Sequence, residues 1–307
     1  MAHLSAFRSG GRFWTGVDGL RSGWAIPLFF LISAAVAAAL FGSVYWLAHY
    51  TPAQIQALRT EILPEVRFPL VIAECCGLVV AMIAMARIEG RSWLDYGLRI
   101  KRAGFLFGQG AFWGALMMAL LVGALTQLHA LTIKTSVSDA SSLVRSGLML
   151  AALFIPGALV EELMFRSYPF FKLARTATPL QAAIWMSLAF GMAHLGNEEE
   201  TVAGIVQVVE VGLVFCLAIW RTQSIWWALG AHACWNWAQT FVFGCSDSGL
   251  APSGQLLVST PTGPDWLSGG ATGPEGSLLS IPIVALLGFI AWRTLPDRSA
   301  TMRDSNS

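Results

Sequence analysis

Long apolar stretches separated by short polar segments dominate the chain. Crossing the hydrocarbon core of a bilayer as a helix takes about 20 predominantly apolar residues. Eight stretches come close to that length: 24–49, 67–87, 104–128, 146–172, 180–196, 202–220, 224–244 and 277–293. The pattern predicts an all-α fold, that of a polytopic integral membrane protein with about eight transmembrane helices. We expect a single transmembrane domain over 24–294, between an N-terminal tail over 1–23 and a polar C-terminal tail over 295–307.

The longest connection between these stretches runs from Cys245 to Glu275. It contains six Gly and four Pro residues and no Lys or Arg. Because both Gly and Pro disfavour helix interiors, this segment is not expected to form a continuous helix.

The composition agrees with a membrane protein and excludes several classes of function. Apolar side chains make up 55% of the 307 residues, only 12% are charged and the mean hydropathy is +0.62, whereas roughly a quarter of the residues in a soluble domain carry charge. The net charge of +1 and the lack of a Lys/Arg cluster exclude nucleic acid as the partner. Five cysteines, an odd number, indicate no disulfide framework.

The distribution of basic residues predicts the orientation. If both termini lie on the inner side of the membrane, 15 of the 19 Lys and Arg residues fall in inner segments and only Arg59, Arg67, Lys134 and Arg145 in outer ones. Cytoplasmic segments carry an excess of Lys and Arg. We therefore expect both termini in the cytoplasm, and an integral protein of a membrane such as the bacterial inner membrane.

The fourth apolar stretch carries the densest group of ionisable side chains. A charged residue near the bilayer centre costs about 2.5–3.5 kcal/mol on the insertion scale, so such residues usually mark a site. Glu162 and Arg166 are spaced i, i+4 and can pair on one helix face. Glu161 lies about 100° around the helix from Glu162 and therefore lacks that partner. An unpaired carboxylate that faces a small wet cavity could act as a general base. Pro156-Gly157, one turn earlier, is expected to bend or open the helix there.

Two later stretches each place two aromatic or polar side chains on one helix face. Phe190 and His194 are spaced i, i+4, so the phenyl ring can pack against the imidazole. His232 and Asn236 have the same spacing and present two hydrogen-bonding groups. Each pair alone is explained better by helix packing. Together with Glu161, they predict polar groups from three helices that converge on one interior cavity.

These motifs resemble a known family. EELMFR (Glu161 to Arg166), FGMAH (Phe190 to His194) and HACWN (His232 to Asn236) match, in order and spacing, the motifs of the CAAX prenyl endopeptidase and bacteriocin-processing family, which includes intramembrane glutamic proteases. The resemblance covers a protease core of about 145–240, and WLSGGATGPEGSLL (Trp266 to Leu279) is similar to a segment often seen in bacterial members. Ser167 stands where the family usually has Gly.

The resemblance implies roles for individual residues. Glu161 and His194 would activate a water molecule, and His232 with Asn236 would form the oxyanion hole. Glu162 and Arg166 would hold the arrangement together. Such a set needs no cofactor. A zinc site of Glu161, His194 and His232 is the alternative, although the chain has no His-Glu-x-x-His helix.

The sequence therefore predicts an intramembrane endopeptidase that acts on a peptide or lipidated-protein substrate within the lipid bilayer. A non-proteolytic scaffold or immunity-type protein of the same fold and a proton-coupled transporter remain as alternatives, although no internal repeat favours a transporter. Two further embedded acids have no motif around them. Glu74 is interpreted as a satisfied interior or cavity-lining acid, and Glu210 is expected to reach the same cavity.

Overall fold

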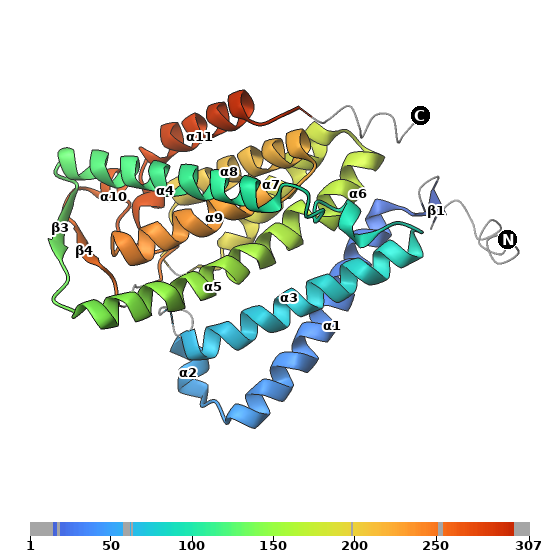
Figure 1. Ribbon diagram of the computed structural model, residues 1–307, viewed down its shortest axis with the longest axis horizontal. Coiled ribbons are helices and arrows are strands. Elements are labelled where there is room, and N and C mark those ends of the chain that lie inside the picture. The colour runs from blue at the N-terminus through green and yellow to red at the C-terminus, as the bar shows by residue number, and fades with distance from the viewer. Residues whose placement is uncertain are drawn as a thin grey trace, which may run out of the picture.

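The protein is a bundle of helices that run approximately along one axis (Figure 1). The computed structural model describes residues 15–16, 19–57, 62, 64–197, 199–250 and 254–297. The longer helices are α1 (Ser22–Ala48), α3 (Pro64–Ile88), α4 (Ala103–Gln127), α5 (Ala140–Arg166), α7 (Pro179–His194), α8 (Val202–Thr222), α9 (Trp226–Trp237) and α11 (Ser280–Thr294). The short ones are α2 (Pro52–Ala57), α6 (Tyr168–Thr176), α10 (Asp265–Ser268), the 3₁₀ turns η2 (Trp93–Asp95) and η4 (Pro274–Gly276), and the π-helical turn η3 (Ala238–Val242).

Each of the eight predicted apolar stretches overlaps one of the longer helices, so the all-α membrane fold is confirmed. Within the described residues, five helical segments are long and apolar enough to cross a bilayer: Ser22–Ala48, Val66–Ile88, Ala103–Gln127, Ala140–Thr176 and Val202–Thr222. Helices α7 and α11 are shorter, with 16 and 15 residues, and α9 is extended by η3. The shorter helices pack among the longer ones.

The fourth stretch is not the single helix that its hydropathy suggests. It breaks at Ser167, where the backbone leaves helical geometry, and resumes as α6 with Pro169 in its first turn. Proline cannot continue a helix without clashing with the carbonyl four residues earlier, so Pro169 explains the break. The Ser167 hydroxyl, fully buried, hydrogen-bonds to the carbonyl of Leu163. In contrast, α5 continues through Pro156 without interruption.

Close packing of α4 against α9 fixes the helix that carries His232. A Cβ atom at Gly110 would lie 2.0 Å from the Trp227 carbonyl oxygen, and one at Gly114 would lie 2.1 Å from that of Ala231. Gly230 approaches α4 equally closely from the other side, at 2.1 Å from the Phe107 carbonyl oxygen. Small residues spaced four apart allow such backbone contact between membrane helices. Direct contact between the backbones of α4 and α9 thus determines the position of α9.

A buried ion pair joins α3 to α6 near the break at Ser167. Lys172 Nζ lies 2.7 Å from Glu89 Oε1, and both side chains are about 1% exposed. The hydroxyl groups of Tyr168 and Tyr96 donate to the same carboxylate, at 2.7 and 2.9 Å. Because the charges are paired and hydrogen-bonded, their burial here is tolerated.

The segment after α9 covers the end of the bundle where β3 (Leu131–Thr135) and β4 (Leu257–Pro261) lie. Its described residues form no long helix, as its Gly and Pro content predicts. Strand β4 pairs antiparallel with β3, which links α4 to α5. A second small sheet pairs β1 (Thr15–Gly16) with β2 (Gly19–Leu20). The start of α1 and the end of α11 lie at one end of the bundle, and β3 and β4 lie at the other (Figure 1).

Candidate functional site

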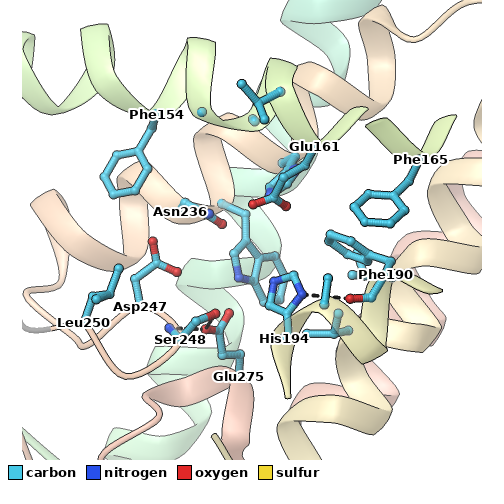
Figure 2. Close-up of a pocket in the computed structure, with 18 of the residues that line it drawn as sticks. Phe154, Glu161, Phe165, Phe190, His194, Asn236, Asp247, Ser248, Leu250 and Glu275 are labelled. Atoms are coloured by element: carbon cyan, nitrogen blue, oxygen red, sulfur yellow. Dashed lines mark hydrogen bonds and ion pairs between the residues drawn. The ribbon is translucent and has the colours of Figure 1, made fainter. Parts of the chain in front are cut away.

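A cavity of about 400 Å³ lies inside the bundle, bounded by α3, α5, α7, α8 and α9. Glu161, His194, His232 and Asn236 all line it. Figure 2 shows the Glu161 carboxylate pointing from α5 into the space that His194 and Asn236 also face. The structure therefore brings together the four side chains that the sequence places on three separate helices.

The two adjacent glutamates of α5 face different surroundings. Glu162 is completely buried, while the Glu161 side chain is 35% exposed to the cavity. Arg166 Nη1 lies 3.4 Å from Glu162 Oε1, and both side chains are fully buried. The predicted i, i+4 pair is confirmed, and the 100° step around the helix turns Glu161 into the cavity.

His232 lies between both glutamates. Its Nδ1 atom is 3.1 Å from Glu162 Oε1, and its Nε2 atom is 3.5 Å from Glu161 Oε2. Glu161 therefore has an imidazole beside it, which the sequence reasoning, limited to one helix at a time, did not include. Glu162 accepts from two sides, so one carboxylate positions Arg166 and His232 together.

His194 is oriented by its own helix. Its Nδ1 atom lies 2.9 Å from the carbonyl oxygen of Phe190. Because a carbonyl oxygen only accepts, Nδ1 carries the proton in this contact, and Nε2 of the neutral ring is a proton acceptor. The Phe190 ring meets the imidazole edge-to-face with centroids 4.6 Å apart, as the spacing predicts.

Aromatic rings enclose the Arg166 guanidinium. Its Cζ atom lies 3.8 Å from the centroid of Phe190, 5.6 Å from that of Phe165 and 5.7 Å from that of Phe215. A buried cation gains about 2 kcal/mol from such a contact when it is desolvated. Phe190 thus touches both the arginine that anchors Glu162 and the histidine that faces the cavity.

Asn236 is one turn beyond His232 on α9, and Trp235 lines the cavity beside it. Within the described residues the Asn236 amide accepts or donates in none of the hydrogen bonds between side chains. An amide free to donate into the cavity is what a role at a developing oxyanion requires.

Several cavity residues come from segments that contain none of the three motifs. Arg67 and Glu74 of α3 and Asp247, Ser248 and Glu275 after α9 all line the wall. Glu74 is therefore a cavity-lining acid, whereas Glu210 is not among the lining residues, contrary to expectation. The only sequence signal for Glu275 is its place in the stretch from Trp266 to Leu279.

Asp247 and Glu275 lie outside the membrane-spanning helices and are each 6% exposed. Ser248 donates to Glu275 Oε1 from both its backbone N–H and its hydroxyl, at 2.5 and 2.8 Å. Burial, followed by the nearby Glu275 and Glu161 carboxylates, raises the pKa of Asp247 well above its ordinary value. Burial likewise raises the pKa of Glu275.

A metal site would require several His, Cys, Asp or Glu side chains around one point. Over the described ranges, no three His, Cys, Asp or Glu side chains are grouped so that they could hold one metal ion. The alternative zinc set of Glu161, His194 and His232 is not found as such a group within the described residues.

Comparison with known families gives a match over the central part of the chain. Residues 143–238 match the type II CAAX prenyl endopeptidase Rce1-like family. This range contains all three motifs, and the resemblance to the CAAX protease family is confirmed over it. Comparisons with curated proteins and with solved structures give no match. The family match supports a CAAX-type intramembrane protease and an integral membrane protein.

Proposed function

We propose that this chain, whose residues 143–238 match the type II CAAX prenyl endopeptidase Rce1-like family, hydrolyses a peptide bond of a membrane-associated or lipidated peptide. One observation carries the proposal: Glu161, His194, His232 and Asn236 line a single cavity within the helix bundle. Peptide hydrolysis needs a base for the attacking water and donors for the oxyanion, and these four side chains supply both.

Water activation falls to Glu161 and His194. The hydrogen bond from His194 Nδ1 to Phe190 leaves Nε2 as the acceptor. The Glu161 carboxylate, exposed to the cavity, is a second acceptor. A water held between them loses a proton as its oxygen attacks the substrate carbonyl, and the same proton is then delivered to the leaving nitrogen.

Stabilisation of the oxyanion falls to His232 and Asn236. Because Nδ1 of His232 is bonded to the Glu162 carboxylate, the ring donates into the cavity from Nε2 only as an imidazolium. The carboxylates of Glu161 and Glu162 flank that ring, and the Arg166 guanidinium pairs with Glu162. Two negative and two positive charges then sum to zero. A donor fixed in a water-poor site contributes about 2.7–4 kcal/mol to lowering the barrier.

The orientation of the protein bears on the substrate. With both termini in the cytoplasm of a bacterial cell, the polar end of the cavity, at Asn197, Asp247, Ser248 and Glu275, faces the other side of the inner membrane. A peptide bond in the outer half of the bilayer, or just beyond it, is then the accessible target. This favours an exported or membrane-anchored peptide over a cytoplasmic one.

The test is Glu161→Gln in purified full-length protein reconstituted into lipid. The variant keeps the size of the side chain but cannot accept the proton of water, so peptide cleavage should fall at least about a hundredfold. The peptides that accumulate in membranes of cells carrying the variant, identified by mass spectrometry, serve as substrates. Cleavage by wild type should also survive a metal chelator.

The alternatives predict different results. If the protein is a scaffold or immunity-type protein, Glu161→Gln leaves the cellular phenotype intact while Arg166→Ala removes folded protein. If it is a transporter, wild-type proteoliposomes show substrate flux without cleavage. Unchanged cleavage by folded Glu161→Gln protein excludes Glu161 as the base.

A further inference from the structure

The cavity contains more acidic groups than the proposed reaction uses. Across it from Glu161, two carboxylates project from the segment after α9: Asp247 and Glu275 (Figure 2). Glu161 and Glu275 each lie close enough to Asp247 to interact with it electrostatically. Neither Asp247 nor Glu275 belongs to the three motifs, and water activation as described above needs neither.

Few basic groups act on these acids. Arg67 interacts electrostatically with Asp247 but also with Glu74, and His194 interacts with Glu275. Like charges held in a low dielectric repel each other strongly, and a buried charge is tolerated only when it is paired. The site is therefore complementary to an added cation.

Asp247 itself is suited to receive that cation. Its side chain is 6% exposed, it points into the cavity (Figure 2), and in the described part of the chain no donor makes a hydrogen bond to its carboxylate. Glu275, by contrast, is held in place by Ser248 through two hydrogen bonds. Glu275 is thus held by hydrogen bonds, whereas the Asp247 carboxylate can accept hydrogen bonds from a ligand.

The surroundings of Asp247 indicate the shape of the ligand. Phe154 and Leu250 line the same cavity as Asp247, and Figure 2 shows the three side chains in the same part of it. Lys and Arg side chains pack their apolar stems on such surfaces and present the charge at the tip. A divalent metal ion prefers oxygen ligands and has little use for apolar side chains around the carboxylate.

We propose that Asp247 and Glu275 form a subsite that binds a Lys or Arg side chain of the substrate, close to the bond that is cleaved. The proposal rests on the proposed function only in taking the ligand to be a peptide. It names the substrate class more narrowly: a membrane-associated peptide with a basic residue near the cleavage site. The attraction between the basic residue and the two acids also draws the peptide into the end of the cavity opposite Glu161.

The test measures binding rather than cleavage. Full-length protein carrying Glu161→Gln, to prevent turnover, is placed in phosphatidylcholine nanodiscs and titrated with fluorescent peptides. The peptides are N-acetylated and C-amidated, with Lys at successive positions of an apolar sequence, and each has a norleucine counterpart. In at least one register the Lys peptide should bind about tenfold or more tightly than its counterpart.

Two further variants locate that preference. Adding Asp247→Asn should reduce it to about twofold or less. Adding Glu199→Gln should leave it unchanged. Glu199 is an exposed acid whose backbone carbonyl accepts from Thr272, in the segment that contains Glu275, but it does not line the cavity. Equal binding of Lys and norleucine peptides in every register, or a preference that survives Asp247→Asn, overturns the proposal.

These experiments distinguish a failure to fold, and a failure of the peptidase assignment, from a failure of the proposed subsite. If Asp247→Asn does not yield folded protein, the comparison of Lys with norleucine peptides on the parent protein decides alone, and equal binding overturns the proposal. Failure of the peptidase assignment would show as absent cleavage by wild type, which leaves this binding comparison intact.

Discussion

The Nε2 atom of His232 lies 3.5 Å from the Oε2 atom of Glu161. This contact crosses from α9 to α5, and the Nδ1 atom of the same ring reaches the neighbouring glutamate, Glu162, at 3.1 Å. One imidazole is therefore held between two acids that are adjacent in sequence but face different environments. Glu162 faces the packed interior with Arg166, and Glu161 faces the cavity. The two acids should respond very differently to the loss of their charge.

Glu162→Gln should destabilise the protein, whereas Glu161→Gln should hardly do so. Removing the Glu162 charge leaves the fully buried Arg166 guanidinium without its counterion, and breaking a buried pair in this way costs about 3–5 kcal/mol. The Glu161 side chain is partly exposed to the cavity, and its replacement should change the free energy of unfolding by less than about 1 kcal/mol. Thermal unfolding of the two variants in the same detergent measures the difference. Equal shifts in Tm would contradict this division of roles.

Phe190→Leu should lower kcat about tenfold with little change in KM. Leucine cannot provide the ring face that lies 3.8 Å from Arg166 or the edge contact with His194, so the base loses its fixed orientation. Phe165→Leu is the matched control, because Phe165 is similarly buried and lies near Arg166 but farther from it, at 5.6 Å. A fall in kcat of the same size in both variants would mean that general packing, and not the orientation of His194, is responsible.

The sequence predicts most of the helices and the pairs that lie within one helix. Hydropathy locates every apolar stretch, and the i, i+4 spacing correctly predicts the Glu162–Arg166 pair and the contact of Phe190 with His194. These features depend on the local geometry of a helix, which periodicity determines directly. The break at Ser167 was not predicted. Pro169 indicates a break, but the apolar residues on both sides of it favour one continuous helix.

Relationships between helices could not be predicted in the same way. The contact of His232 with both glutamates depends on the relative height and rotation of α5 and α9, which no spacing within either helix encodes. Asp247 and Glu275 reach the cavity through an irregular segment rich in Gly and Pro, where no periodicity places a side chain. The Gly110 and Gly114 pair, spaced four apart, was an available signal for the crossing of α4 with α9.

Stability should fall as the pH rises from about 4 through the neutral range, and Asp247→Asn should weaken this fall. Burial and the neighbouring carboxylates raise the pKa of Asp247 in the folded protein, while the unfolded chain has the ordinary value of about 4. The folded state therefore binds more protons than the unfolded state between these two values, so the free energy of unfolding decreases as the pH increases.

Thermal unfolding of wild type, Asp247→Asn and Glu199→Gln across that pH range measures this effect. Asparagine cannot ionise, so its contribution is independent of pH. The exposed Glu199 serves as the control, and its replacement should leave the wild-type slope. An identical slope in Asp247→Asn and wild type would show that Asp247 carries no such penalty.

Gly114→Ala should lower activity about a hundredfold although it adds only a methyl group remote from the attacking water. The new Cβ would lie 2.1 Å from the carbonyl oxygen of Ala231, a backbone atom that no rotamer change can move. Helix α9 must shift away, and His232, the next residue, shifts with it. Overpacking of this kind costs about 1–3 kcal/mol, and a displacement of about 1 Å at a catalytic group can cost about a hundredfold in rate.

Gly108→Ala on the same helix is the control, because a Cβ there meets nothing within 4 Å and alanine favours the helix by about 1 kcal/mol. Cleavage rates and Tm values for the two variants, measured side by side, separate close helix packing from helix propensity: full activity in folded Gly114→Ala protein would show that the α4–α9 crossing does not position His232.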